Sequence, residues 1–333
     1  MTTAIVVTSI NSPNAGLERI ARGAHQHGIP FIVVGDTRSP QNFELPGCRF
    51  VSLDAQLASR LRFAAVCPLG SYARKNIGYL LAIADGAKII IETDDDNIPL
   101  PAFFEQRVRR VETAVVTEAR WLNIYRYFSE VNIWPRGLPL DAVNPPLPPF
   151  DQLEVLEVEC PIQQGLVDEN PDVDAIYRLL LPLPQSFRKD RCIALGRGTW
   201  CPFNSQNTTW WAATFPLMYL PAHCSFRMCD IWRALVAQRV AWENGWHILF
   251  HGPTVWQDRN EHNLMRDFAD EVPGYLHNNC IRHALENTTL LGGVQNLLAD
   301  LRRCYEVLIK IEIIAADEIV LLDAWTADLE SLG

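Results

Sequence analysis

The sequence predicts an α/β fold with a parallel sheet and a helical C-terminal region, and three observations lead to this prediction. Residues 1–100 alternate apolar runs with amphipathic segments. This βαβα order is typical of a parallel sheet with right-handed crossovers. The same alternation returns after residue 215. From about Val294 onward, apolar residues recur at helical spacing, with no glycine or proline before Gly333.

The elements expected in residues 1–100 are delimited by turn and capping residues. One expected helix covers residues 17–27 and ends just before Gly28, and a second covers residues 71–85 and begins at the cap Ser71. Apolar runs of strand length occupy residues 4–8, 31–35, 49–53 and 88–93. Because carboxyl ends of parallel strands meet at one edge, we expect a ligand site there.

Prolines punctuate the middle of the chain. Residues 144–149 and 181–184 are rich in proline and indicate extended connections. In the second half we expect a helix at residues 231–242 and strands at residues 155–159, 217–220 and 247–250. The simplest organisation is one α/β domain over residues 1–265, followed by a helical extension over residues 266–333.

The composition is that of a soluble globular protein. Its 333 residues are 48% hydrophobic and 20% charged. A net charge of −10 argues against nucleic-acid binding, which normally requires a basic face. No apolar run approaches the roughly 18 residues of a membrane span, and the N-terminal sequence lacks the basic start of a signal peptide. Nine cysteines without metal-type spacing fit reduced thiols, so we expect a cytoplasmic protein.

Three consecutive aspartates, Asp94, Asp95 and Asp96, follow the expected strand at residues 88–93. Adjacent carboxylates repel one another, and a hard divalent cation such as Mg²⁺ or Mn²⁺ would neutralise them. Magnesium usually completes its coordination with water and substrate phosphates. The sequence therefore indicates a metal held for a phosphorylated substrate. A solvated acidic turn is an equally good interpretation of the residues alone.

Two cations, Arg74 and Lys75, stand near the start of the helix expected at residues 71–85. Cations oppose the helix dipole at this end, so their position makes sense if they bind an anion such as phosphate. An ordinary solvated pair is the simpler explanation.

Polar residues also follow the first two expected strands. Thr8, Ser9 and Asn11 follow the first, and Asp36 follows the second. All four are expected at the same sheet edge as the aspartates. There Asp36 can accept hydrogen bonds from a ribose or a base, or it can simply begin a turn.

The segment of residues 202–211 mixes amide and aromatic side chains, including Asn204, Gln206 and Asn207. Sugars need hydrogen-bonding amides beside apolar ring faces, so this segment is a candidate substrate site, although a surface turn has the same composition.

Three further candidates lie in the second half of the chain. Asp230 stands where a helix is expected to begin, so it either caps that helix or deprotonates an acceptor hydroxyl as a general base. Arg233 follows one turn later as a candidate substrate contact. His251 follows the strand expected at residues 247–250, where it either has a structural role or coordinates a metal.

Several runs together resemble the STELLO-type family of plant glycosyltransferases. The resemblance covers roughly residues 1–265 in order. The runs that carry it are Ser71-Tyr-Ala-Arg-Lys-Asn-Ile-Gly-Tyr-Leu, Glu92-Thr-Asp-Asp-Asp-Asn, Gln163-Gln-Gly-Leu-Val, Pro171-Asp-Val-Asp-Ala-Ile-Tyr-Arg178, Pro202-Phe-Asn-Ser-Gln-Asn-Thr and Asp230-Ile-Trp-Arg with Ala237-Gln-Arg239. More distantly, the pattern is similar to the plant reversibly glycosylated polypeptides, which are nucleotide-sugar mutases.

The resemblance implies a GT-A fold, a Rossmann-like mixed sheet flanked by helices. It implies a nucleotide-binding half over residues 1–112 and an acceptor half over residues 150–265. The aspartates would form the Asp-x-Asp metal motif, with Asp96 the direct ligand and Asp94 bridging ribose and metal, and His251 matches a late metal-binding histidine by position. The plant members carry a membrane anchor that these residues lack, so a soluble enzyme is expected.

Three functions are compatible with these features. The first is a metal-dependent glycosyltransferase that uses a UDP- or GDP-sugar and a carbohydrate or lipid-linked acceptor, with Asp230 as base if the reaction inverts the anomeric carbon. The second is a mutase that interconverts pyranose and furanose nucleotide sugars. The third is a non-catalytic assembly partner, for which the C-terminal helices could provide a homo-oligomer surface.

Overall fold

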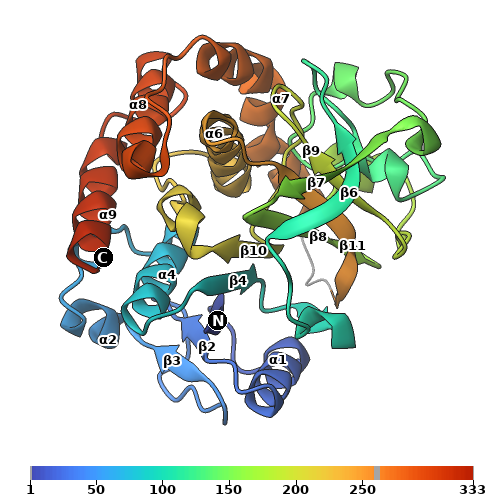
Figure 1. Ribbon diagram of the computed structural model, residues 1–333. Helices are drawn as coiled ribbons and strands as arrows, with labels where there is room; N and C mark the ends of the chain where they lie inside the picture. The colour runs from blue at the N-terminus through green and yellow to red at the C-terminus, as the bar shows by residue number, and fades with distance from the viewer. Residues whose placement is uncertain (1, 259–262, 333) are drawn as a thin grey trace.

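The computed structural model describes residues 2–258 and 263–332, and these residues form a mixed sheet between layers of helices (Figure 1). The sheet has eleven strands in the order β3-β2-β1-β4-β10-β8-β11-β9-β6-β7, with β5 pairing β11. The strands are β1 Thr3–Thr8, β2 Phe31–Val34, β3 Arg49–Val51, β4 Ile89–Thr93, β5 Asn97–Pro99, β6 Arg110–Val116, β7 Glu154–Glu159, β8 Ile162–Asp168, β9 Cys192–Leu195, β10 Asn207–Trp211 and β11 Ile248–Gln257.

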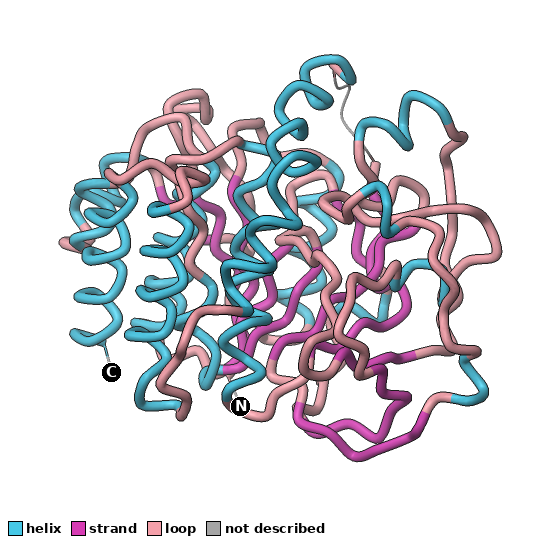
Figure 2. Tube along the Cα trace, turned by 90° about the horizontal axis from the view of Figure 1, so that it is seen from above, coloured by secondary structure: helices cyan, strands magenta, loops and turns pink. Residues whose placement is uncertain are grey.

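The α-helices flank this sheet and form the C-terminal region. They are α1 Ala15–Gln26, α2 Leu53–Ala58, α3 Arg62–Val66, α4 Lys75–Ala84, α5 Ala175–Leu180, α6 Cys229–Glu243, α7 Leu264–Glu286, α8 Leu297–Lys310 and α9 Glu318–Leu332. Figure 2 shows the helices gathered on the side of the molecule where the C-terminus lies, with long loops at the opposite end. The prediction of an α/β fold with a mixed sheet, flanking helices and a helical C-terminal region is confirmed.

The first four strands along the sheet are parallel, as their βαβα order predicts. The parallel arrangement ends at β10, which is antiparallel to both β4 and β8. Beyond it, β11 is parallel to β8 and antiparallel to β9. The parallel arrangement predicted from the βαβα order of residues 1–100 is therefore found in these four strands, and the sheet as a whole is mixed.

The two faces of the sheet are covered by different helices because successive strand residues point to opposite sides. In β1, Ile5 and Val7 pack in one apolar cluster with Leu17 and Ile20 of α1. Val6 instead belongs to the larger cluster on the other face, which includes residues of α4, α6, α8 and α9. The apolar stripe of α8 is buried in this second cluster, so it is covered within the chain.

Most sequence-predicted elements are present, but one strand is shorter than predicted and another is absent. The third strand stops at Val51, because Ser52 accepts a hydrogen bond from the Ala55 amide and caps α2. Residues 217–220 do not form the expected strand: Leu217 and Met218 end the 3₁₀ helix Ala212–Met218, which contains Pro216, and Tyr219 and Leu220 follow that helix. Proline has no N–H to give to a sheet ladder, which explains why an apolar run does not become a strand here.

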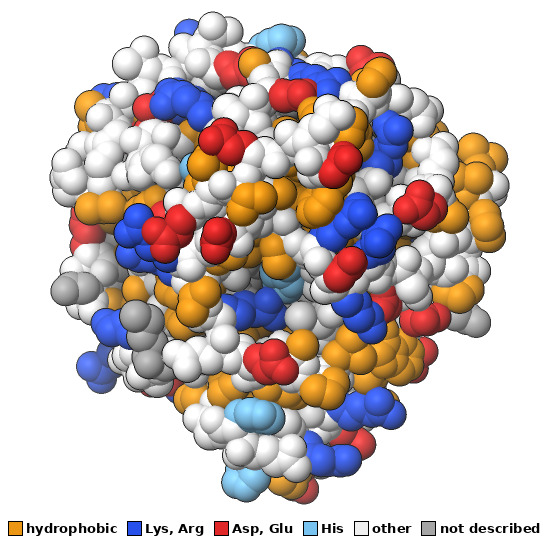
Figure 3. Space-filling model, turned by 45° about the vertical axis from the view of Figure 1, so that its right-hand side comes forward, with side chains coloured by type: hydrophobic (Ala, Val, Ile, Leu, Met, Phe, Trp, Pro, Cys, Tyr) orange, Lys and Arg blue, Asp and Glu red, His pale blue; other side chains and the backbone are white. Residues whose placement is uncertain are grey.

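The surface and the helices carry two further observations. On the face shown in Figure 3, acidic and basic side chains are interspersed and do not form one large patch of a single sign. Among residues 2–258 and 263–332, no helix combines the length and hydropathy of a membrane span.

Candidate functional site

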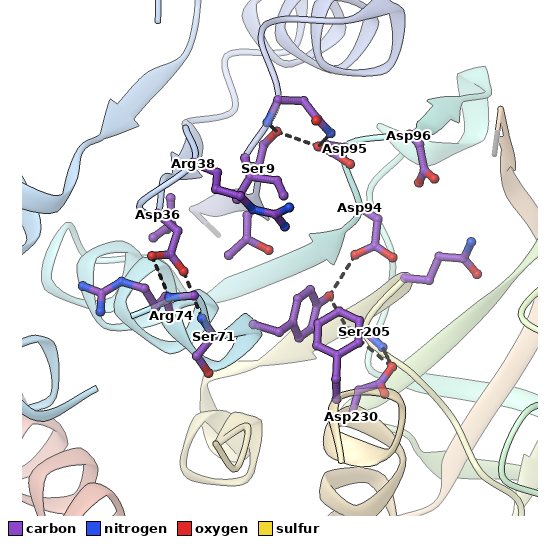
Figure 4. Close-up of a pocket in the computed structure, with 18 of the residues that line it drawn as sticks. Ser9, Asp36, Arg38, Ser71, Arg74, Asp94, Asp95, Asp96, Ser205 and Asp230 are labelled. Atoms are coloured by element: carbon purple, nitrogen blue, oxygen red, sulfur yellow. Dashed lines mark hydrogen bonds between the residues drawn. The ribbon is translucent and has the colours of Figure 1, made fainter. Parts of the chain in front are cut away.

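A cavity of about 360 Å³ opens at the carboxyl ends of β1, β2 and β4 (Figure 4). This is the edge where the sequence places its polar residues, and it is where open α/β sheets bind ligands. The cavity brings together segments that are far apart in the chain. Its polar lining includes Thr8, Ser9, Asn11, Asp36, Arg38, Ser71, Tyr72, Arg74, Asp94, Asp95, Asp96, Arg136, Asp172, Ser205, Gln206, Arg227, Asp230 and Gln257.

The residues that follow β1 hold the middle aspartate of the cluster. Ser9 Oγ donates to Asp95 Oδ2 at 2.5 Å, and Asn11 Nδ2 donates to the same oxygen at 3.0 Å. Ser9, Asn11 and Asp95 thus form one hydrogen-bonded group at the carboxyl edge of the sheet, where the sequence predicts polar residues to gather. The second oxygen of Asp95, Oδ1, accepts no hydrogen bond from the described residues.

Asp94 points in another direction, toward Tyr72 and Lys75. Tyr72 Oη donates to Asp94 Oδ1 at 2.8 Å, and Lys75 Nζ lies 3.3 Å from the same oxygen. Burial raises the pKa of Asp94, and the Lys75 ammonium opposes this rise. The other oxygen of Asp94, Oδ2, accepts no hydrogen bond within the described part of the chain.

Asp96 faces the far end of the cavity and is buried. Gln257 Nε2, at the end of β11, donates to both of its carboxylate oxygens at 3.0 Å. The three adjacent aspartates therefore diverge rather than converge on one point (Figure 4). Residues 2–258 and 263–332 hold no group of three or more His, Cys, Asp or Glu side chains placed to coordinate one metal ion.

The opposite wall of the cavity is a buried ionic cluster of Arg136, Asp172 and Asp230. The Arg136 guanidinium donates two hydrogen bonds to Asp172, both 2.8 Å long, and two to Asp230, at 2.8 and 3.0 Å. Burial alone would raise the pKa of Asp230, but the Arg136 charge and hydrogen bonds hold it below its ordinary value. The Asp230 carboxylate is thus kept ionised beside the Arg136 guanidinium.

A chain of hydroxyl groups connects the two walls. Tyr72 Oη, which donates to Asp94, lies 2.6 Å from Ser205 Oγ. Ser205 Oγ lies 3.5 Å from Asp230 Oδ2, and the Ser205 amide donates to the same oxygen at 3.3 Å. Asp230 and the aspartate cluster therefore line one cavity from opposite sides.

The two cations predicted to hold phosphate have other partners. Lys75 is completely buried, and its ammonium donates to Tyr72 Oη, Thr93 O and Ser205 O at 2.8–3.0 Å. The Arg74 side chain borders the cavity, but its Nε donates to Gln56 at 2.8 Å and its Nη1 to the carbonyl oxygen of Cys67 at 3.0 Å. Both charges therefore stabilise loops around the cavity.

Asp36 lines the cavity, yet both of its oxygens accept backbone hydrogen bonds. The Gly70 amide donates to Oδ1 and the Ser71 amide to Oδ2, each at 3.0 Å. This places the start of the 3₁₀ turn Tyr72–Arg74, which Ser71 caps and which leads into α4. The Asp36 carboxylate thus fixes the neighbouring loop at Gly70 and Ser71.

Four other predicted site residues lie outside the cavity. Asn204 donates to Asp172, and Asn207 donates to Leu166 O and Thr254 Oγ1. Arg233 is buried in an ion pair with Glu92. The His251 ring is hydrogen-bonded to Arg107 and to the Gly252 carbonyl oxygen. Burial keeps the pKa of His251 well below its ordinary value. The structure brings none of these four residues to the cluster Asp94–Asp96. Gln206, from the same segment as Asn204 and Asn207, does line the cavity.

Sequence reasoning missed several residues that line the cavity. Tyr72, Asp172 and Ser205 lie within the runs that carry the STELLO resemblance, so that signal could have singled them out. Arg136 stands between Pro135 and Gly137 in a loop with no periodicity, and no local pattern marks it. Arg38, whose exposed side chain extends into the cavity in Figure 4, follows Asp36 in a turn.

The chain is homologous to two curated plant proteins. It is 31% identical to "Probable glycosyltransferase STELLO2" of Arabidopsis thaliana over 287 residues, which are 80% of this chain and 37% of the relative. It is 29% identical to "Probable glycosyltransferase STELLO1" of the same plant over 270 residues, 75% of this chain and 35% of the relative. The chain thus spans little more than a third of these relatives. The predicted resemblance to the STELLO proteins is confirmed as sequence homology.

Other comparisons are less informative. No protein-family profile matches the chain. A crystal structure of a mycobacterial protein is similar with 11% identity and a TM-score of 0.43, covering 83% of this chain and 74% of that one. The crystal structure of M. tuberculosis glucosyl-3-phosphoglycerate synthase is similar with 13% identity and a TM-score of 0.42, covering 91% and 81%. These similarities are too weak to support a conclusion about activity.

Proposed function

We propose that this chain, a homologue of the STELLO proteins, is a glycosyltransferase that uses a nucleotide-diphospho-sugar together with a divalent cation. One observation carries the proposal: a single cavity at the carboxyl ends of the parallel strands has the aspartate cluster on one wall and the Arg136–Asp172–Asp230 cluster on the other. A nucleotide-sugar donor needs both walls, because its anomeric carbon lies between its phosphates on one side and the acceptor on the other. The curated relatives are named as probable glycosyltransferases, which agrees with this assignment.

The nucleotide is assigned to the wall formed by Ser9, Asn11 and Asp36. Their side chains follow β1 and β2 and border the cavity next to Asp95. Arg38 is the cation best placed for the diphosphate: among the described residues its guanidinium has no carboxylate partner, whereas Arg74 and Lys75 are engaged elsewhere. Arginine binds phosphate oxygens through charge-assisted hydrogen bonds.

The carboxylates fit a hard cation that shares its coordination with the donor. Asp94 Oδ2 and Asp95 Oδ1 accept no hydrogen bond from the described residues, so each has an oxygen to offer. Two carboxylates, with phosphate oxygens and water, are the usual ligand set for Mg²⁺, and Mn²⁺ accepts the same donors. We therefore assign the ion to Asp94 and Asp95, whereas Asp96 is held by Gln257. The bound ion would neutralise the charge of the leaving diphosphate.

Asp230 is assigned to the reacting end of the donor. Its depressed pKa keeps the carboxylate ionised at neutral pH. If the reaction inverts the anomeric carbon, Asp230 accepts the proton of the acceptor hydroxyl. If it retains the configuration, the same negative charge stabilises the positive charge that develops at the anomeric carbon, as in other glycosyl transfers. Both courses require Asp230 within reach of the sugar.

Donor binding tests this proposal directly. Calorimetric titration of the protein with UDP-, GDP-, CMP- and TDP-sugars, with and without MnCl₂, should give metal-dependent binding of at least one donor. Asp95→Asn should abolish the metal dependence, whereas Asp85→Asn, a surface carboxylate outside the cavity, should not. If no nucleotide sugar binds in either condition, the proposal is wrong.

The products distinguish transfer from isomerisation. A transferase releases the nucleoside diphosphate when it is given a carbohydrate or lipid-linked acceptor. A mutase instead converts the nucleotide sugar without releasing nucleotide, so chromatography of the reaction mixture separates the two activities. Metal-dependent donor binding with neither reaction would favour a non-catalytic assembly partner.

A further inference from the structure

A second cavity, of about 380 Å³, adjoins the cavity of Figure 4, which we call the donor cavity. This volume lies within the range of small-molecule sites in proteins. We call the second cavity the apolar groove, and its apolar lining includes Pro68, Leu69, Pro221, Ala222 and Phe226. In the described part of the chain, no Asp, Glu, Lys or Arg side chain lines it.

The apolar groove begins beside Asp230. Tyr72 and Phe226 line both cavities, and their rings meet edge to face with centroids 6.0 Å apart. Cys229 lines the groove, whereas Asp230, the next residue of α6, lines the donor cavity. Since Asp230 is the carboxylate assigned to the acceptor hydroxyl, an acceptor that reaches it has the groove alongside.

The polar side chains of the groove are bonded within the protein. Tyr72 Oη donates to Asp94 at 2.8 Å, on the donor side of the rim. His223 Nδ1 lies 3.1 Å from a buried carboxylate oxygen of Glu318, and the Cys229 thiol donates to a backbone carbonyl oxygen at 2.9 Å. A sugar unit placed here would give up hydrogen bonds to water and regain few, which is unfavourable. The groove therefore suits an apolar group better than a second sugar.

Two large apolar side chains of the groove remain exposed. Leu69 is 64% exposed and Phe226 is 62% exposed, although most of the large apolar side chains around them are buried. A hydrocarbon chain in the groove would cover both side chains and remove their apolar surface from water, which favours binding.

We propose that the apolar groove holds the hydrocarbon chain of a lipid-linked acceptor whose hydroxyl group reaches Asp230. This inference rests on the proposed function and decides between its two classes of acceptor, the carbohydrate and the lipid-linked one. The uncharged lining beside the reacting carboxylate carries it. The chain contributes affinity and direction, and the hydroxyl group at its end is the part that takes part in transfer.

A series of n-alkanols tests the groove in the wild-type protein. Butanol, hexanol and octanol each carry one hydroxyl group and differ only in chain length. In calorimetric titrations, affinity should rise roughly two- to fourfold for each added methylene group, because each buries a similar apolar area. Bound octanol should not displace UDP or GDP, since the nucleotide is assigned to the donor cavity. Affinity that does not depend on chain length, or displacement of the nucleotide, would overturn the inference.

Competition separates the two acceptor classes. Octyl glucoside, used below its critical micelle concentration, should compete with octanol because its chain fills the same groove. Cellobiose has no apolar chain and should not compete. Displacement of octanol by cellobiose would show that the groove binds carbohydrate, and the inference would be wrong.

Two variants test the lining. Leu69→Ser changes a residue that lines only the groove, so it should weaken octanol binding at least roughly threefold and leave nucleotide binding unchanged. Phe226→Ser, at the shared rim, should weaken octanol binding to a similar degree. Val108→Ser is the matched control, since Val108 is 63% exposed and lies outside both cavities. Equal effects of Leu69→Ser and Val108→Ser would contradict the proposal.

Nucleotide binding distinguishes the two possible failures. If neither UDP, GDP nor any nucleotide sugar binds the wild type with MnCl₂, the proposed function is wrong and the groove has no acceptor to hold. If nucleotide sugars bind but the alkanols show no dependence on chain length, only the inference is wrong. A variant that still binds the nucleotide has also kept its fold, so loss of octanol binding there reports on the groove itself.

Discussion

The buried ion pair between Arg233 and Glu92 gives a prediction whose magnitude follows from the structure. Arg233 Nη1 lies 2.8 Å from Glu92 Oε1, and the side chains are 1% and 0% exposed. The guanidinium also donates to the carbonyl oxygen of Asn204 at 3.1 Å. Glu92 accepts further hydrogen bonds from Tyr79 and Trp210. Arg233 thus neutralises a carboxylate in the centre of the sheet and has no contact with the cavity.

Arg233→Met should therefore lower stability rather than ligand binding. Removing one partner of a buried pair leaves an uncompensated charge, which costs about 3–5 kcal/mol. For a chain of 333 residues the entropy of unfolding is about 0.7 kcal/mol per kelvin, so the melting temperature should fall by about 4–7 °C. Thermal unfolding followed by circular dichroism measures the shift, and titration with UDP and MnCl₂ at low temperature measures the remaining binding.

A surface pair provides the control for this experiment. Arg49 Nη1 lies 2.8 Å from Asp85, but these side chains are 51% and 53% exposed. Exposed pairs contribute about 0–1 kcal/mol, so Arg49→Met should lower the melting temperature by less than about 1.5 °C. If Arg233→Met shifts the melting temperature no more than this control but weakens binding of a nucleotide sugar, Arg233 contacts the ligand and the structural reasoning is refuted.

Three further predictions concern other charged residues. Arg38→Gln should weaken nucleoside diphosphate binding about tenfold and reduce its salt dependence, which calorimetry at two ionic strengths checks against Arg49→Gln. Asp230→Asn should lower turnover at least about 100-fold with little change in nucleotide affinity; unfolding at unchanged specific activity would show a structural role instead. Burial raises the pKa of Asp174 to about 6, above the value of 3.8 in the unfolded chain. The fold therefore favours the protonated carboxyl over the ionised one. The stability that Asp174 contributes is complete below pH 4 and is lost as the pH rises through 6. Urea unfolding from pH 4 to 7 should show a loss of roughly 3 kcal/mol that Asp174→Asn lacks, and parallel curves for the two proteins would contradict it.

Local patterns in the sequence were sufficient for elements whose residues alternate or recur regularly. Ile5 and Val7 of β1 face one apolar cluster and Val6 the other, as the twofold repeat of a strand requires. The strand that ends at Thr93 delivers Asp94 to the carboxyl edge of the sheet, as predicted. The pattern failed at residues 217–220, where apolar residues serve the core from a 3₁₀ helix and loop that carry Pro216.

The partners of charged groups could not be read from the sequence, because they come from other segments. Arg233 meets Glu92 from 141 residues away, and Arg136 meets Asp230 from 94 residues away. Lys75 stands beside Arg74 in a position that fits phosphate binding, yet its ammonium is buried against backbone carbonyls. A residue type and its place on an element do not determine whether its charge faces a ligand or the protein.

The sequence by itself determined the α/β class, the acidic edge of the sheet and the relationship to the STELLO proteins, since each depends on residues that are close together in the chain. Only the tertiary structure decided the antiparallel entry of β10, the divergence of the three aspartates and the pairing of Arg136 with Asp172 and Asp230. The physical reason is that hydrogen bonds and ion pairs act over a few ångströms in space. Which groups come within that range depends on how the whole chain packs.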